Sequence, residues 1–139
     1  MTTPRAVIDT SVLYAGLYSA NGASFQILSL IEERRLTPVL STTLLFEYEE
    51  VLTRGHEELG LSENDIEDVL NGFCKRGDNR RIHFLWRPHL RDVKDDHVLE
   101  LAVAAGGVDI LTHNIKDFDA ADTFGIRVLP PSAALREFR

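Results

Sequence analysis

The chain lacks the features of several common protein classes. Its 139 residues include one cysteine, Cys74, which excludes an internal disulfide and a thiolate metal site. No apolar run approaches the length that spans a membrane, and Arg5 and Asp9 interrupt any signal-peptide core. We therefore expect a soluble, cytoplasmic protein. With 44% apolar residues, the chain can form one core in a single domain covering residues 1–139.

Several catalytic signatures are also missing. No two histidines have the i, i+4 spacing of a zinc-binding helix, no Gly-x-Gly-x-x-Gly loop is present, and no serine lies in a nucleophile-elbow pattern. We expect the histidines to be surface or capping residues; they are His56, His83, His89, His97 and His113. These absences leave the acidic residues as the main candidates for chemistry.

The charges are unevenly distributed. The net charge of −7 argues against nucleic acid as a partner when taken alone. Residues 47–68, however, contain nine acids and one arginine, whereas residues 75–91 contain six basic residues and one acid. An acidic surface facing a basic one suits a metal-dependent enzyme that acts on a phosphodiester. Two oppositely charged solvated faces are the simpler interpretation of the same pattern.

Short apolar runs alternate with helical patterns along the chain. The expected strands cover residues 6–8, 38–40, 82–86, 108–112 and 127–129. The expected helices cover residues 23–35, a segment capped by Thr42 or Thr43, residues 62–75, and a segment from Asp95 or Asp96 to Gly106. This alternation predicts a three-layer α/β/α fold with a parallel sheet. Periodicity does not supply the order of the strands.

Acidic and amide side chains recur where an apolar run ends or a helix begins. The set is Asp9, Glu47, Asp96, Asn114 and Asp117. In a parallel sheet the ligand site lies beyond the carboxyl ends of the strands, and Asp9 and Asn114 fall just past such ends. Carboxylates gathered from distant segments repel one another unless a cation lies between them. The pattern therefore predicts a Mg²⁺ or Mn²⁺ site.

Each of these residues also has a purely structural interpretation. Asp9 could cap a helix that follows the first strand, and Glu47 could be a surface glutamate. Asp96 could be an N-cap, a position for which Asp95 competes. Asp117 could begin a short helix. The set as a whole, rather than any member, favours a functional site.

Four segments in order carry a family resemblance. They are residues 7–13, 45–52, 91–102 and 110–118, with the sequences VIDTSVL, LFEYEEVL, RDVKDDHVLELA and ILTHNIKDF. These segments resemble the four motifs of PIN-domain ribonucleases, including the VapC-like toxins of toxin–antitoxin pairs. The motifs place Asp9, Glu47 and Asp96 on the acidic positions of the family. The resemblance extends from Val7 to about Leu129.

The resemblance implies a five-stranded parallel sheet and a Mg²⁺- or Mn²⁺-dependent endoribonuclease that hydrolyses RNA phosphodiesters. The implied metal ligands are Asp9, Glu47, Asp96 and Asn114. The implied catalytic residues are Asp9, Glu47, Asp96 and Asp117, supported by Thr10, Ser11 and Thr112. The implied contacts to the RNA backbone are Lys75, Arg76, Arg80, Arg81 and Arg87. The expected partners are single-stranded RNA, an antitoxin protein and a second copy of the chain in a homodimer.

The sequence departs from the family pattern at Asn114, where aspartate is usual. Asparagine keeps an oxygen ligand but has no charge, so we expect weaker ion binding unless Asp117 or Asp92 compensates. Two other functions stay open. One is an inactive PIN-fold scaffold that binds RNA or a protein without cutting it. The other is a phosphoacceptor domain of the response-regulator kind, which would need an aspartate and a lysine where the chain has Ser41 and Arg127.

Overall fold

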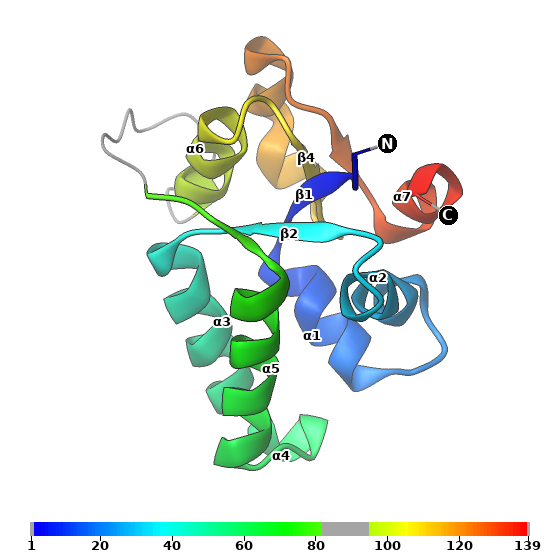
Figure 1. Ribbon diagram of the computed structural model, residues 1–139, viewed down its shortest axis with the longest axis vertical. Coiled ribbons are helices and arrows are strands. Elements are labelled where there is room, and N and C mark those ends of the chain that lie inside the picture. The colour runs from blue at the N-terminus through cyan, green and yellow to red at the C-terminus, as the bar shows by residue number, and fades with distance from the viewer. Residues whose placement is uncertain (1, 82–94, 139) are drawn as a thin grey trace.

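The computed structural model, which describes residues 2–81 and 95–138, contains a parallel sheet of five short strands (Figure 1). The strands are β1 (Arg5–Ile8), β2 (Thr37–Leu40), β3 (Asp78–Asn79), β4 (Asp109–Leu111) and β5 (Val128–Leu129). Their spatial order is β3-β2-β1-β4-β5. Ala6 lies opposite Pro38 on one side and Asp109 on the other, so β1 is the central strand.

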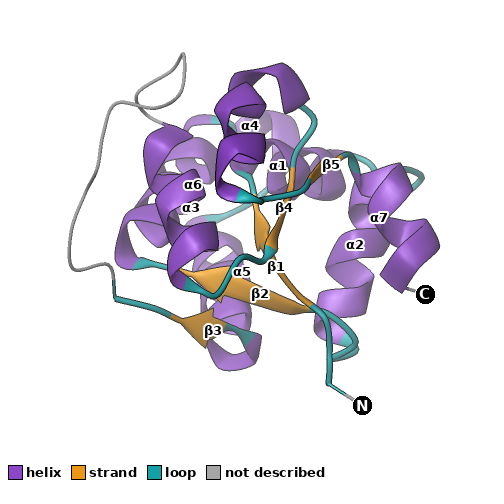
Figure 2. Cartoon of the chain, turned by 90° about the horizontal axis from the view of Figure 1, so that it is seen from above, coloured by secondary structure: helices purple, strands orange, loops and turns teal. Residues whose placement is uncertain are grey.

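Helices surround this sheet on both faces, as the cartoon in Figure 2 shows. They are α1 (Thr10–Tyr18), α2 (Ala23–Glu32), α3 (Thr42–Arg54), α4 (His56–Leu59), α5 (Glu63–Arg76), α6 (Asp96–Ala104), the 3₁₀ segment η2 (Ile115–Phe124) and α7 (Pro131–Phe138). In Figure 1, α6 lies above strand β2, and α1, α2, α3 and α5 lie below it. The predicted three-layer α/β/α architecture with a parallel sheet is confirmed.

The core is centred on β1 because helices cover both faces of the sheet there. Ala6, Val7 and Ile8 are fully buried, as expected for a short apolar run in a parallel sheet. Helix α6 contacts β1, β2 and β4 and buries Val98 and Leu99 completely. No helix within residues 2–81 and 95–138 is long and apolar enough to cross a membrane.

The third strand differs from the sequence prediction. The segment 82–86, expected as a strand, lies outside the described residues, and the sheet is instead extended by β3 directly after α5. Gly77 makes this junction possible, since a Cβ there would lie 2.5 Å from Leu40 Cδ1 and 2.7 Å from the carbonyl oxygen of Phe73. Sequence reasoning missed β3 because Asp78 and Asn79 are polar and short edge strands carry little hydrophobic pattern.

Capping groups explain where two helices begin. The N-cap of α3 is Ser41 rather than the predicted Thr42 or Thr43, and its Oγ accepts a hydrogen bond from the backbone N–H of Leu44 at 3.1 Å. Helix α5 begins with a capping box. Ser62 Oγ accepts from the N–H of Asp65 at 3.1 Å, and Asp65 Oδ2 accepts from the N–H of Ser62 at 2.9 Å. Helices α4 and α7 were not predicted, and α1 was expected only in the interpretation in which Asp9 caps a helix.

A charged cluster ties β3 to β1 and makes a pH-dependent contribution to stability. Asp78 Oδ2 lies 3.0 Å from Arg80 Nη2 and 2.8 Å from Arg5 Nη1, and the hydrogen bonds from Arg80 and then Arg5 lower the pKa of Asp78. A lowered folded-state pKa stabilises the protein above the unfolded-state pKa, and this stability is lost as pH falls through the folded-state pKa.

We therefore expect Asp78→Asn to lower the free energy of unfolding by about 1 kcal/mol or less at neutral pH, because the ion pairs are partly solvated. The difference between the variant and the parent should vanish in acid. Urea unfolding across the acid range measures it. A difference that stays constant with pH would show that the Asp78 charge is not responsible.

Candidate active site

The strand order defines one crevice at the edge of the sheet. From β1 the chain proceeds to β2 and β3 on one side, whereas β4 and β5 lie on the other. The connections that leave β1 and β4 therefore diverge at their carboxyl ends, which is where parallel α/β sheets bind ligands. Asp9 follows β1 directly, and its N–H donates to the carbonyl oxygen of Leu111 at the end of β4 at 2.9 Å.

Asp9 is a buried carboxylate held by two hydroxyl groups. It occupies the N-cap position of α1, but its side chain makes no capping hydrogen bond, so the capping interpretation of this side chain is wrong. Its Oδ2 instead accepts hydrogen bonds from Ser11 Oγ at 2.8 Å and Thr112 Oγ1 at 2.7 Å. Asp9 is 3% exposed. Within residues 2–81 and 95–138, no ion pair neutralises its charge.

Glu47 reaches the same edge from α3. Its Oε1 accepts a hydrogen bond from Thr10 Oγ1 at 3.4 Å, and its Oε2 contacts His97 Nε2. The side chain of His97 is 8% exposed, so its expected role as a surface or capping residue is wrong. Its position directly after Asp96 at the start of α6 is the sequence signal that could have identified it.

Helix α6 contributes two buried carboxylates. Asp96 is its first residue and is fully buried, while Asp95 occupies the N-cap position without a side-chain capping bond. Glu100, one turn after Asp96, is 2% exposed. Sequence reasoning did not select Glu100, although the i, i+4 spacing of two acids on an apolar helix places both on one face.

Tyr48 connects the core to this edge. It is fully buried, and its hydroxyl donates a hydrogen bond to the carbonyl oxygen of Ile8, the residue before Asp9. Burial raises the pKa of Tyr48 well above its ordinary value, and the charges of Asp9 and Glu47 raise it further. Tyr48 therefore stays protonated beside two carboxylates that come from segments far apart in the sequence.

The turn after β4 brings the remaining predicted residues to the edge. Thr112 is fully buried, and its Oγ1 accepts a hydrogen bond from the N–H of Asn114 at 2.9 Å. Asn114 is exposed and precedes η2, whereas Asp117 is half-buried in the first turn of η2. The N–H of Asp117 donates to the carbonyl oxygen of Asn114 at 3.0 Å. Both side chains thus belong to one turn at this edge.

The donor set of this edge suits a hard cation. Asp9, Glu47 and Asp96 offer carboxylate oxygens, the ligands preferred by Mg²⁺ and Mn²⁺. In the described parts of the chain, no three His, Cys, Asp or Glu side chains are grouped closely enough to hold an ion. The chemistry of the residues therefore fits such an ion, and binding would require the carboxylates to move closer together.

Two of the predicted RNA contacts lie at the same edge of the sheet as Asp9, the edge formed by the carboxyl ends of the strands. Arg80 and Arg81 follow β3 at its carboxyl end, and the N–H of Arg80 bonds the carbonyl oxygen of Leu40 at 2.7 Å. The guanidinium of Arg80 is hydrogen-bonded to Asp78 through Nε and Nη2, both at 3.0 Å. Arg81 is exposed.

The other predicted RNA contacts are placed differently. Lys75 and Arg76 end α5, which leads into the amino end of β3, so they lie toward the opposite edge of the sheet. Arg76 also donates to the carbonyl oxygen of Gly72 at 3.2 Å. Arg87 and Asp92 lie outside the described residues.

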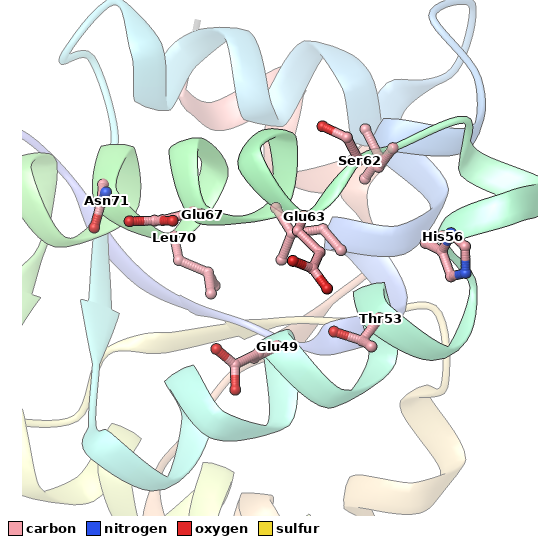
Figure 3. A pocket seen from close by; sticks show the side chains of 10 residues that line it. Glu49, Thr53, His56, Ser62, Glu63, Glu67, Leu70 and Asn71 are labelled. Carbon is pink, nitrogen blue, oxygen red and sulfur yellow. The ribbon is translucent and has the colours of Figure 1, made fainter.

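One hollow in the surface lies away from the buried carboxylates. It has a volume of about 780 Å³ and lies between α3 and α5. Figure 3 shows side chains that line it, among them Glu49, Glu63, Glu67, Leu70 and His56. None of the predicted site residues that the structure describes lines this hollow. We place the candidate active site at the sheet edge because Asp9 and Asp96 are buried there at the end of β1 and the start of α6.

Comparison with known protein families identifies one to which this chain is similar. A family model described as PIN domain matches residues 5–116. The matched segment begins in β1 and contains Asp9, Glu47, Asp96 and Asn114, and it ends one residue before Asp117. Comparison with curated proteins gave no match.

Proposed function

Since this chain belongs to the PIN domain family, whose members are generally nucleases, we propose that it is a metal-dependent endoribonuclease and the toxin of a toxin–antitoxin pair. The observation that carries the proposal is the environment of Asp9. This carboxylate is buried at the switch point of the sheet, and its hydrogen-bond donors among the described residues are two neutral hydroxyl groups. A buried carboxylate without a neutralising partner is costly, and a bound cation would remove that cost.

The proposed site uses Mg²⁺ or Mn²⁺, which when bound acts as a Lewis acid and lowers the pKa of water. Asp9, Glu47 and Asp96 would hold the ion, and Asn114 or Asp117 would complete its ligands. Among the described residues, both hydrogen bonds to the Asp9 side chain fall on Oδ2, so Oδ1 can serve as a ligand.

Side chains around these ligands would fix their positions. Ser11 and Thr112 orient Asp9, and Thr10 and His97 hold the two oxygens of Glu47. Such neighbours typically change metal affinity or activity by about 10- to 100-fold when removed.

The proposed substrate is single-stranded RNA, because a flexible backbone can bring a phosphate into an acidic edge. Arg80 and Arg81 lie on that side of the sheet and would contact the RNA backbone. We also propose an antitoxin protein as partner, a homodimer as the oligomeric state and the cytoplasm as the location.

A catalytically weak or inactive PIN scaffold is the second candidate function. Two observations favour it. Asn114 replaces the aspartate usual at its position, and no three potential ligands are grouped in the described part of the chain. Such a scaffold would bind RNA or a protein without metal-dependent cleavage.

An RNA cleavage assay on variants of two nearby glutamates, Glu47 and Glu49, tests the proposed activity. We expect Glu47→Gln to reduce Mg²⁺- or Mn²⁺-dependent cleavage by about tenfold or more, since it removes one charged ligand. The matched control is Glu49→Gln, an exposed position two residues further along α3, which should cleave at the parental rate. Equal rates in Glu47→Gln and its parent would exclude Glu47 from the site. Binding of RNA without cleavage by the parent, with either ion, would favour the scaffold.

Metal titration distinguishes Asn114 from Asp117. We expect Asn114→Asp to tighten Mn²⁺ binding severalfold, because it adds a negative charge to the ligand set. The same change should lower the melting temperature of the metal-free protein through repulsion between like charges, and added Mn²⁺ should restore it. If Asp117 already completes the site, Asp117→Asn will weaken Mn²⁺ binding more than Asn114→Ala. Calorimetric titration and thermal melts measure both effects. Unchanged affinity in Asn114→Asp and Asp117→Asn would exclude both positions.

A further inference from the structure

An apolar hollow of about 460 Å³ adjoins the candidate active site. The residues that line it include Thr10, Ser11, Tyr14, Tyr18, Val51 and Glu58. Thr10 donates a hydrogen bond to Glu47 and Ser11 donates one to Asp9, so the hollow borders the carboxylate edge. A ligand that occupied it would therefore extend directly from the reacting position.

Two tyrosines of α1 form the aromatic part of this hollow. Tyr14 and Tyr18 follow Thr10 at intervals of four residues, so the three side chains share one face of the helix. Each interval advances about 6 Å along the helix axis, so the rings lead away from Thr10 one after the other. Tyr18 is 60% exposed and available to a ligand.

The ring of Tyr14 is held in place by its surroundings. A Cβ atom at Gly55 would lie 2.5 Å from Tyr14 Cε2 and from its hydroxyl oxygen, so a glycine at the end of α3 is what lets the ring approach. The hydroxyl donates a hydrogen bond to Glu58 Oε1 on α4, and this bond raises the pKa of Tyr14. The aromatic surface is thus already positioned before any ligand binds, which limits the entropy lost on binding.

The chemistry of the hollow favours a base over a phosphate. Among the described residues that line it there is no lysine or arginine, and Glu58 would repel an anion. An aromatic ring beside an apolar wall suits the flat face of a nucleobase, which stacks on tyrosine regardless of its identity. Glu58 Oε2 could accept a hydrogen bond from an exocyclic amine of that base.

We propose that this hollow binds the base of a nucleotide next to the scissile phosphate of single-stranded RNA. The inference rests on the proposed function, since RNA bound at the carboxylates is what brings a base to the hollow. The stacked base would fix the adjacent phosphate at the carboxylate edge and set the register of cleavage.

Equilibrium binding of short, fluorescently labelled single-stranded RNA tests this, with Ca²⁺ in place of Mg²⁺ or Mn²⁺ so that a cation neutralises the carboxylates. Gel analysis of the RNA checks that none is cleaved during the measurement. A second set of RNAs carries one abasic nucleotide at successive positions. We expect Tyr14→Leu and Tyr18→Ala each to weaken binding by roughly fivefold to 100-fold, as for the loss of one stacked base. The parent should lose a similar factor at one abasic position, and the Tyr18→Ala variant should not.

Two further variants sharpen the comparison. Gly55→Ala keeps both tyrosines, and the backbone φ of −98° at residue 55 is one that alanine adopts readily. The added Cβ atom, however, would displace the ring of Tyr14. It should therefore weaken binding as Tyr14→Leu does. The control is Phe25→Ala, which removes a 40% exposed aromatic outside the hollow and should bind as the parent does. Circular dichroism of each variant checks that it is folded.

The outcomes separate this inference from the proposed function. Unchanged RNA affinity in folded Tyr14→Leu and Tyr18→Ala would overturn the base subsite, even if the parent cleaves RNA with Mg²⁺. Abasic sensitivity that depends on Tyr18 would support the subsite even if the parent fails to cleave, in which case only the nuclease assignment falls. A parent that binds no RNA would overturn the subsite, and the hollow would then be open to a protein partner.

Discussion

The Asp9→Asn variant is expected to lose at least about 100-fold in metal-dependent RNA cleavage while remaining folded. Asparagine keeps an oxygen that can accept hydrogen bonds from Ser11 and Thr112, so the local structure should persist. It lacks the negative charge that would hold the ion, and several kcal/mol of transition-state stabilisation depend on that ion. Cleavage rates with Mg²⁺ and Mn²⁺, together with circular dichroism, measure this.

A second measurement tests the same prediction independently. Removing a buried charge should raise the melting temperature of the metal-free protein, and the rise in melting temperature that Mn²⁺ gives the parent should disappear. The control is Asp68→Asn, an exposed aspartate on α5 that should leave both cleavage and the Mn²⁺ effect unchanged. A folded Asp9→Asn protein that cleaves RNA at the parental rate would disprove the proposed site.

The Tyr48→Ala variant is expected to lose about 3–5 kcal/mol in the free energy of unfolding, the usual cost of truncating a large buried aromatic residue. Tyr48 is fully buried, and its ring packs edge-on against Phe73 with the ring centroids 5.5 Å apart. Tyr48→Phe keeps this packing but removes the donor to the carbonyl oxygen of Ile8, so we expect it to lose about 1–3 kcal/mol. Urea unfolding of both variants gives the two values.

Tyr48→Phe should also affect the site, because Ile8 immediately precedes Asp9. We expect metal-dependent cleavage to fall in this variant even under conditions where it is fully folded. Tyr18→Phe, which changes a 60% exposed tyrosine, should alter stability by less than about 0.5 kcal/mol. Equal stabilities of Tyr48→Phe and its parent would show that the buried hydroxyl contributes nothing to the fold.

Several parts of the site could be predicted from the sequence because they depend on local pattern. Asp9 and Asn114 each follow an apolar run, and in a parallel sheet such runs end at a common edge. The structure places both residues at that edge. Whether they bind a metal stays a prediction, as do the roles of Glu47, Asp96 and Asp117.

Other parts could not be predicted because they depend on contacts between distant segments. His97 meets Glu47 across fifty positions of sequence, and Tyr48 reaches Ile8 across forty. Residue type alone made His97 an expected surface residue, and no pattern in the sequence selected Tyr48 for the site. Their neighbours are set by the packing of α3 and α6 against the sheet, which periodicity does not report.

The sequence by itself determined that this protein is an α/β protein with a parallel sheet and a nuclease-type PIN fold. Alternating apolar runs and helical patterns require that architecture, and the motifs from Val7 to Phe118 resemble the family that adopts it. The tertiary structure alone decided that β1 lies between β2 and β4, which makes the ends of β1 and β4 the switch point. Strand order depends on which long-range pairings bury the most surface, whereas periodicity records only that each strand is buried. For the same reason only the folded chain shows the ring of Tyr14 over Gly55 beside the buried carboxylates.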